Sequence, residues 1–384
     1  MVKKILFLFS FFILQSIHSQ VTFVLESIPE NTPENAAIYI SGDFESWTGG
    51  QSRYLLQKKG QYYFITLPKQ GNTIRFKFTQ GNWETAETNI KGNSIDNRTY
   101  TFKEREETVK ITILNWDKNT GIKKSTAAKN VSILSDTFKI PQLNRDRKIW
   151  IYLPPTYKVT TKKYPVIYMH DGQNLFDNAT SFSGEWEIDE TLNQLYKENG
   201  FEIIVIGINN GGKKRLDEYS PWKNEKYGGG EGEAYAEFIT QTLKPYVDKN
   251  YRTKPNKEHT AIMGSSMGGL ISFYTALKYP NVFGKVGVFS PSFWFSEKSY
   301  AYAKTYGTIK NTKMYFLAGG KEDGNTAFEE IGQTVKNMNT MVEVLQKKAV
   351  KSSSITSKIV PEGEHNEKLW KNEFKEAVQW LFNL

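Results

Sequence analysis

The sequence predicts a small all-β domain followed by a larger α/β domain with a mostly parallel sheet. Three observations support this fold class. Residues 20–117 contain short strand-like runs separated by Gly, Asn and Pro turns, and residues 131–384 alternate apolar strands with amphipathic helices. A glycine-flanked turn then joins one of these strands to the helix after it. A length of 384 residues exceeds what one hydrophobic core usually organises, so two domains are expected.

Composition and charge exclude several classes of protein. Hydrophobic residues make up 39% of the chain and aromatic residues 14%, as in globular proteins that bury sizeable cores. Cysteine is absent, which excludes disulfides, thiolate catalysis, zinc fingers and iron–sulfur clusters. The formal charge is +9, but Lys and Arg are scattered among acidic residues and form no long basic run. We therefore expect no nucleic-acid partner.

Residues 1–19 have the pattern of a signal peptide. Lys3 and Lys4 precede an apolar run at 5–14, and small and polar residues follow up to Ser19. The apolar run is shorter than the roughly 20 residues that a membrane-spanning helix needs, and no later segment qualifies. The sequence therefore predicts a secreted or periplasmic protein without a membrane span.

Residues 20–117 are expected to form a small β-sandwich. Its clearest strands are expected at 37–40, 62–67, 73–78 and 109–113, each bounded by turn residues. Residues 118–130 are polar and lack periodicity, which is typical of a linker.

Residues 131–384 show the alternation of an α/β sheet. Nearly continuous apolar runs are typical of strands that are covered on both faces, whereas a spacing of three and four residues is typical of helices. Strands are expected at 148–153, 164–169, 203–207, 260–263, 286–289, 314–318 and 355–359, and helices at 187–198, 233–248 and 326–347.

Residues 264–268 match the pattern G-x-S-x-G. A strand is expected directly before this motif, at 260–263, and a helix directly after it, at 269–277. Glycines on both sides allow a strained turn from strand to helix, which lifts the hydroxyl of the central serine clear of the sheet. We therefore predict that Ser266 is a nucleophile.

A serine nucleophile needs a base and an acid. In chains with this arrangement of strands and helices, the acid follows the serine and the histidine follows the acid. Of the four histidines, His365 alone follows Ser266, in the loop after the strand at 355–359. Glu322 and Asp323 both follow the strand at 314–318. Adjacent residues rarely point the same way, so we expect one carboxylate to orient His365 and the other to be solvated, with Glu322 preferred.

The negative charge that develops on an ester carbonyl needs two hydrogen-bond donors. One is expected to be the backbone N–H of Met267, directly after the nucleophile. The other is expected to be the backbone N–H of Gln173, in the loop after the strand at 164–169, where His170 orders the loop. This chemistry requires no metal and no organic cofactor.

Several motifs together resemble the putative esterase family of α/β-hydrolases, which includes feruloyl and acetylxylan esterases, siderophore esterases and antigen 85 acyltransferases. These motifs are Tyr-Leu-Pro-Pro at 152–155, His-Asp-Gly-Gln-Asn-Leu-Phe at 170–176, Glu-Tyr-Ser-Pro-Trp at 218–222, the motif at 264–269 and Ser-Pro-Ser-Phe-Trp at 290–294. The resemblance implies an α/β-hydrolase fold for residues 131–384 and a triad of Ser266, His365 and either acid. By motif position it also places Trp294, Trp222 and Tyr219 along the substrate cleft, although each can equally belong to the core.

The N-terminal domain resembles starch-binding carbohydrate-binding modules and their immunoglobulin-like relatives. The resemblance rests on Gly-Asp-Phe-Glu-Ser-Trp at 42–47, Phe-Lys-Phe at 76–78, Trp-Glu-Thr at 83–85, Asn-Arg-Thr-Tyr at 97–100 and Trp116. It implies that Trp83 stacks on a sugar ring, with Lys77 and Asn97 as polar contacts. Alternatively, these tryptophans are packing residues, and the domain serves only to position the next one.

Together these observations favour an exported serine esterase that acts through an acyl-enzyme intermediate. The expected substrate carries acetyl or feruloyl groups on a polysaccharide or oligosaccharide, which the N-terminal domain would bind. Two alternatives stay open: an esterase that opens siderophore trilactones, and a non-catalytic glycan-binding protein.

Overall fold

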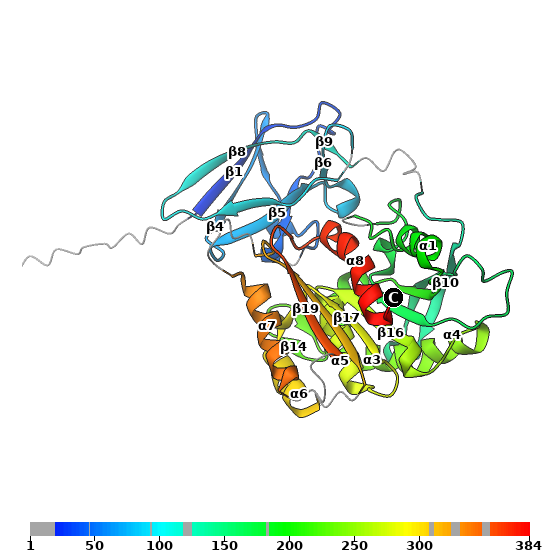
Figure 1. The fold of residues 1–384 in the computed structure, drawn as a ribbon. Coiled ribbons are helices and arrows are strands. Elements are labelled where there is room, and N and C mark those ends of the chain that lie inside the picture. Colours follow the sequence, from blue (N-terminus) through cyan, green and yellow to red (C-terminus); the bar gives the residue numbers. More distant parts are fainter. Residues whose placement is uncertain are drawn as a thin grey trace, which may run out of the picture. The chain divides into compact units, whose positions relative to one another are not determined.

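The polypeptide forms two compact units that divide between residues 118 and 119 (Figure 1). The computed structural model describes residues 20–45, 47–92, 94–117, 125–181, 184–306, 311–323, 331–347 and 354–384. The predicted signal peptide, residues 1–19, lies outside them. The helices within these ranges lack the combination of length and hydropathy that a transmembrane segment needs. Each unit is described by itself.

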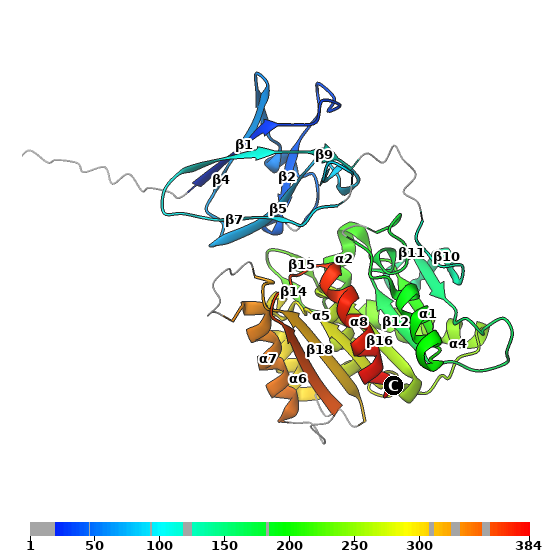
Figure 2. The same ribbon diagram turned by 45° about the horizontal axis from the view of Figure 1, so that its top comes forward.

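The N-terminal unit is all-β (Figure 2). One sheet has the strand order β3-β4-β1-β8, and a second sheet has the order β2-β5-β7. Strand β1 runs antiparallel to β4 and parallel to β8. The bounds are β1 Gln20–Ser27, β2 Tyr39–Gly42, β3 Gln57–Lys59, β4 Tyr62–Pro68, β5 Thr73–Thr79, β7 Arg98–Thr101 and β8 Glu107–Thr112, with a small pair of strands at β6 Glu87–Thr88 and β9 Asn115–Trp116.

Both sheets of this unit contribute to one core. Alternate residues Val21, Phe23 and Leu25 of β1 are buried, as expected of a strand with one face against a core. They belong to the same apolar cluster as Phe76 and Phe78 of β5. Aromatic side chains therefore supply much of the packing in a unit that has no cysteine.

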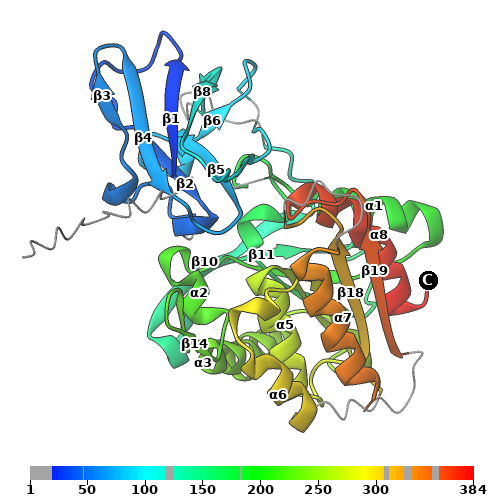
Figure 3. The same ribbon diagram turned by 90° about the vertical axis from the view of Figure 1, so that its left-hand side faces the viewer.

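The C-terminal unit is built on a sheet of eight strands in the order β10-β11-β13-β12-β16-β17-β18-β19 (Figure 3). The six strands from β13 to β19 are parallel, whereas β11 runs antiparallel to β13 and β10 antiparallel to β11. This mixed sheet confirms the expected α/β architecture. Its bounds are β10 Val131–Ile140, β11 Arg145–Tyr152, β12 Val166–His170, β13 Ile204–Ile208, β16 Thr260–Ser265, β17 Lys285–Phe289, β18 Lys313–Gly319 and β19 Ile355–Val360.

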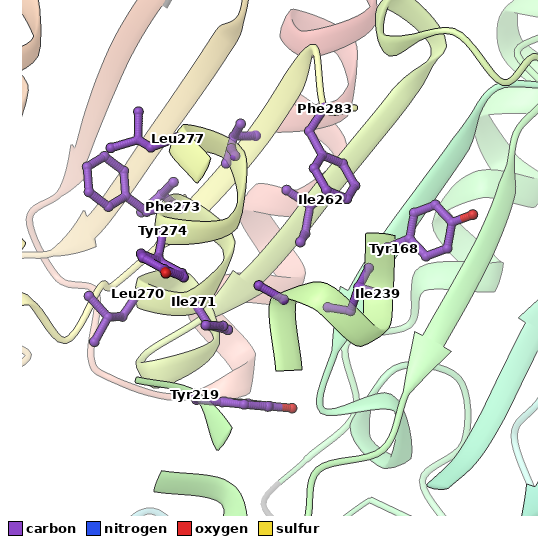
Figure 4. Packing of buried hydrophobic residues seen from close by; sticks show 14 of the residues in the cluster. Tyr168, Tyr219, Ile239, Ile262, Leu270, Ile271, Phe273, Tyr274, Leu277 and Phe283 are labelled. Atoms are coloured by element: carbon purple, nitrogen blue, oxygen red, sulfur yellow. The ribbon is translucent and has the colours of Figure 1, made fainter. Parts of the chain in front are cut away.

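Helices cover both faces of this sheet because its strands are apolar on both sides. In β12, Val166 and Tyr168 pack into one cluster with helices α3 to α7, and Ile167 and Met169 pack into another with α1 and α8. Figure 4 shows the first cluster, in which α5 lies against the sheet. The helices are α1 Ile188–Asn199, α2 Arg215–Glu218, α3 Gly232–Glu237, α4 Lys244–Asn250, α5 Met267–Lys278, α6 Lys298–Tyr306, α7 Gln333–Gln346 and α8 Glu367–Phe382.

The helix expected at 233–248 is irregular. A π-helical segment, Phe238–Leu243, separates α3 from α4. Pro245 lies in the first turn of α4, where it lacks an N–H and its ring crowds the carbonyl four residues earlier. This proline explains why the regular hydrogen-bond ladder is interrupted just before it.

Two expected boundaries also differ. The helix expected from residue 326 begins at Gln333 as α7; residues 326–330 lie outside the described ranges, and Ile331 is exposed rather than part of an apolar face. Of the expected linker, 118–130, residues 118–124 lie outside the described ranges. Thr126 and Ala128 donate backbone hydrogen bonds to Asp177 and Asp189 of the C-terminal unit, so the described part of this stretch belongs to that unit.

Candidate active site

Ser266 lies on a tight turn between β16 and α5, as the G-x-S-x-G motif predicts. Its backbone has φ 57° and ψ −124°. This conformation costs a residue other than glycine about 1–3 kcal/mol. The turn is held by hydrogen bonds on both sides. Ser266 N–H donates to the carbonyl of Phe289, and the carbonyl of Ser266 accepts from the N–H groups of Leu270 and Ser292.

Close packing requires glycine at 264 and favours it at 268. A Cβ at Gly264 would lie 2.7 Å from the carbonyl oxygen of Gly268 and 2.9 Å from the ring of His170. A Cβ at Gly268 would lie 3.2 Å from the Cβ of His170. The turn therefore packs directly against His170, at the end of β12.

His365 and Glu322 form a hydrogen-bonded pair. His365 Nδ1 lies 2.9 Å from Oε2 of Glu322, whose side chain is fully buried, whereas His365 stays 21% exposed. The other carboxylate oxygen of Glu322, Oε1, accepts from the N–H of Gly319 at 2.7 Å and from the hydroxyl of Ser290. With all these donors in place, Glu322 can hold the imidazole in one orientation and one tautomer.

Asp323 has a different role. Its carboxylate accepts from the N–H and the hydroxyl of Thr334, at 2.9 and 3.0 Å, in the first turn of α7. This is the position where a carboxylate satisfies the free N–H groups of a helix. The two neighbouring acids thus point to different partners, and the structure pairs His365 with Glu322.

The loop after β17 connects the serine turn to the acid. Ser292 Oγ lies 3.3 Å from Ser266 Oγ, and the buried Ser290 bonds to Glu322. Trp370 of α8 donates from Nε1 to Ser290 Oγ at 2.8 Å, and its ring lies edge-on to His365. Sequence reasoning assigned no role to Ser290, Ser292 or Trp370, although the motif at 290–294 was a signal that marked this loop.

All these groups lie at one edge of the sheet. Ser266, Ser290, Glu322 and His365 follow the carboxyl ends of β16, β17, β18 and β19, which are neighbouring parallel strands. The last two loops are also tied together, because Lys321 N–H donates to the carbonyl of Gly363 at 2.9 Å. Within the described residues, the hydroxyl of Ser266 is paired with Ser292 rather than with His365.

A charge pair anchors the loop that follows β12. Asp171 has a left-handed backbone, with φ 56°, and its carboxylate accepts two bonds from Arg215, at 2.8 and 2.9 Å, and one from Asn210. Burial would raise the pKa of Asp171, but Arg215 outweighs it, so this pKa is lowered and the carboxylate stays charged. Gly172 cannot carry a side chain, because its Cβ would lie 2.7 Å from the backbone of Gly207.

His170 is buried beneath this loop, and its Nδ1 atom lies 3.1 Å from the hydroxyl oxygen of Tyr235. Burial lowers its pKa to about 3, so its ring is neutral at ordinary pH. His170 therefore acts as a packing residue between the loop and the serine turn, consistent with an ordering role.

The two expected oxyanion donors lie on these two turns. Met267 is the first residue of α5, where amide groups have no acceptor within the helix. Gln173 lies in the short 3-10 helix Gly172–Asn174, and its side-chain Oε1 accepts from the N–H of Asn210 at 3.2 Å. The side chain of Gln173 thereby helps to fix the backbone that carries the second donor.

The three aromatic residues expected along the cleft differ in exposure. Trp294 is 49% exposed and lies edge-on to Tyr227, with ring centroids 5.5 Å apart. Trp222 is half-buried and packs edge-on against Tyr274. The prediction for Tyr219 is wrong: its ring is fully buried against His170, and its hydroxyl accepts from the N–H of Asp171, so it supports the loop from within the core.

In the N-terminal unit, the residues expected to contact sugar also differ in exposure. Trp83 is half-buried, its Nε1 donates to the carbonyl of Trp47, and the two rings lie 5.7 Å apart. Asn97 is exposed. The prediction that Lys77 contacts sugar is wrong, because Lys77 is buried and its amine lies 3.5 Å from the hydroxyl of Ser94. Trp116 is buried in the core, as the packing alternative predicted for it.

Comparison with known proteins identifies the class of the C-terminal unit. The sequence profile of the family described as "Putative esterase" matches residues 140–381, and the chain belongs to this family. It is a carboxylic ester hydrolase. An uncharacterised protein of Bacillus subtilis, YbbA, is 28% identical over 245 residues, which cover 62% of this chain and 93% of YbbA.

Two further relatives match parts of the chain. An endo-1,4-beta-xylanase/feruloyl esterase of Xylanibacter ruminicola is 25% identical over 60% of this chain and 29% of its own length. An alpha-amylase of Niallia circulans is 40% identical over 92 residues, which are 23% of this chain and 7% of the amylase. Among solved structures, an enterobactin esterase of Shigella flexneri covers 95% of this chain and 93% of its own, with 14% identity and a TM-score of 0.53, which shows a shared fold.

Replacement of Glu322 by Gln should lower kcat by about 10²–10⁴-fold, because a neutral amide neither fixes the tautomer of His365 nor stabilises its charged form. Asp323→Asn is the matched control, since Asp323 contacts Thr334 and not His365. We expect it to change kcat by less than about threefold. Steady-state kinetics on a chromogenic ester, with the melting temperature of each variant, measures both. Equal losses in the two variants would show that the pairing with Glu322 has no special role.

Proposed function

We propose that the protein is a serine esterase in which Ser266 attacks the carbonyl carbon of an acyl ester and forms an acyl-enzyme. The observation that carries this proposal is the pairing of His365 with the buried Glu322 at the same sheet edge as the strained turn of Ser266. Such a turn presents a hydroxyl at the start of a helix, and such a pair prepares an imidazole to accept its proton.

The steps follow from the donors and acceptors of the site. Since Glu322 occupies Nδ1 of His365, Nε2 is the nitrogen that takes the proton of Ser266. The carbonyl oxygen becomes an oxyanion and accepts from the N–H groups of Met267 and Gln173. His365 then protonates the leaving alcohol. In the second half of the reaction, His365 takes a proton from a water molecule, which attacks the acyl-enzyme and releases the carboxylic acid. A bond between nucleophile and base often tightens only when substrate binds, so the pairing of Ser266 with Ser292 is compatible with this path.

For the substrate, we propose acetyl or feruloyl groups on a polysaccharide or oligosaccharide. Trp294 is a large exposed ring two residues from Ser292, and its flat face suits an aromatic acyl group or the apolar face of a sugar. The similarity to a xylanase/feruloyl esterase supports an acyl group on a glycan. The similarity of the N-terminal region to an amylase supports a glycan-binding sandwich of immunoglobulin-like type.

We further propose export, on the grounds of the charged and apolar pattern at residues 1–19. A second candidate is a siderophore trilactone esterase. The specific observation in its favour is that the likeness to an enterobactin esterase extends over both units of this chain, whereas the xylanase relative matches 60% of it.

Release of p-nitrophenol from its acetate and of ferulate from methyl ferulate should be abolished by Ser266→Ala, because the variant lacks the nucleophile. We expect a loss of at least about 10³-fold, with only uncatalysed background remaining. Ser266→Ala should keep the melting temperature of the unmodified protein, which excludes unfolding as the cause. Unchanged ester cleavage in the variant would contradict the serine mechanism, and turnover of a trilactone alone would favour the second candidate.

Trp83→Ala should weaken binding of the full chain to soluble starch or xylan by about tenfold, since one stacking ring contributes on the order of 1–1.5 kcal/mol. The measurement is isothermal titration in the Ser266→Ala background, where no ester is cleaved. Tyr62→Ala is the control, because Tyr62 is an exposed aromatic residue elsewhere in the same unit. No binding of either glycan, or equal effects of both substitutions, would contradict a sugar site at Trp83.

A further inference from the structure

Three carboxylates converge at the start of α1, away from the residues of the proposed triad. Glu185 precedes the helix, and Asp189 and Glu190 lie in its first turn. One oxygen atom from each of the three lies within 4.8 Å of the others. The charged groups that act on Glu185 are Glu190, Glu187 and Asp177, which are all acidic. Within the described residues, none of the three carboxylates forms an ion pair with Lys or Arg.

The convergence alone would not define a site, but Asp189 provides a second observation. Its side chain is fully buried, its Oδ1 atom accepts no bond from a donor group, and the carboxylate of Glu190 lies within hydrogen-bonding reach of Asp189. Oε1 of Glu185 is also buried without a partner. A buried carboxylate oxygen without a donor is costly, and more so when the group is charged. Two such atoms in one cluster indicate that a positively charged ligand belongs there.

The other oxygen of each carboxylate is already in use. Asp189 Oδ2 accepts from the N–H of Ala128 at 2.7 Å, and Glu185 Oε2 accepts from the hydroxyl of Thr126 at 2.8 Å. Each side chain is therefore fixed by the segment 125–128 through one oxygen, and its other oxygen remains available to a ligand. Fixed geometry of this kind lowers the entropy cost of binding an ion.

The charges around the cluster agree with this geometry. The charged side chains that act on Glu185 are acidic, so the cluster attracts a cation. The positive end of the α1 dipole opposes a cation only weakly compared with coordination by several carboxylates.

We propose that Glu185, Asp189 and Glu190 bind one hard divalent cation, with Ca²⁺ preferred over Mg²⁺. Oxygen ligands select hard cations. Ca²⁺ holds oxygens at about 2.3–2.6 Å, so two of its ligands can be up to about 5 Å apart, whereas around Mg²⁺ the limit is about 4.2 Å. The three oxygens lie within 4.8 Å of one another, which Ca²⁺ accommodates, and its flexible coordination suits three carboxylates better than the strict octahedron of Mg²⁺.

The role of this ion would be structural and does not depend on the proposed ester chemistry. The segment between its ligands backs the loop that carries Gln173: Trp186 N–H donates to the carbonyl of Asn174 at 2.9 Å, and Ile188 N–H donates to that of Leu175 at 3.1 Å. A bound cation would tie together this segment, the first turn of α1 and residues 125–128. It would therefore stiffen the support of the oxyanion loop without touching substrate.

The test is isothermal titration of the EDTA-treated full chain with CaCl₂ and, separately, with MgCl₂. We expect one Ca²⁺ per chain and weaker binding of Mg²⁺. Asp189→Asn should weaken Ca²⁺ binding at least tenfold. Glu187→Gln is the matched control, because Glu187 lies beside the cluster but pairs with Lys371, and it should change affinity by less than about threefold.

Thermal unfolding of the same proteins guards against a misfolded variant. Asn can still accept the bond from Ala128, and its neutral side chain relieves the repulsion in the cluster, so Asp189→Asn in EDTA should melt no lower than the unmodified protein. Ca²⁺ should raise the melting temperature of the unmodified protein by several degrees and leave that of Asp189→Asn unchanged. Absence of Ca²⁺ binding, or equal binding by the folded variant, would overturn the site; equal affinity for Mg²⁺ would overturn the preference for Ca²⁺.

Discussion

The backbone of Ser266 has a strained conformation with a positive φ at the junction of β16 and α5, and the surrounding parts of the C-terminal unit hold it there. A carbonyl of β17 accepts its N–H, and the first turn of α5 and the loop after β17 use its carbonyl. The glycines on either side leave room for His170 to pack against the turn. A costly conformation persists only where surrounding contacts fix it in this way, and the same contacts fix the position of the Ser266 hydroxyl.

The parallel sheet explains how residues distant in sequence meet at this turn. Neighbouring parallel strands end at one edge, so the loops after β16 to β19 bring Ser266, Ser290, Glu322 and His365 together although 99 positions separate the first from the last. Glu322 and His365 also differ in how far they are buried. Glu322 is fully buried and saturated with donors, His365 is partly exposed, and the N-terminal amide of α5 faces the same edge. A buried carboxylate with this many donors can orient a partly exposed imidazole.

Sequence reasoning predicted the parts of this site that depend on local patterns or on chain order. Ser266 follows from its motif and His365 from its place after the nucleophile, and the parallel strands follow from their apolar runs. The choice between Glu322 and Asp323 depends on which way two adjacent side chains point, and only tertiary contacts with His365 and Thr334 separate them. Tyr219 was misplaced because an aromatic motif residue can face a cleft or the core equally well. The buried carboxylates of Glu185 and Asp189 lack any recognisable spacing, so packing alone reveals them.

The central claim is that Ser266 forms a covalent bond to the acyl group, and mass spectrometry of the protein after treatment with an alkyl fluorophosphonate tests it most directly. Such a reagent reacts with a serine that has an activated hydroxyl and an oxyanion site beside it. The account predicts one adduct per chain, mapped to the peptide that contains Ser266, with labelling retained in Ser292→Ala and abolished in Ser266→Ala. An adduct on another residue, or a folded protein that stays unlabelled, would contradict it.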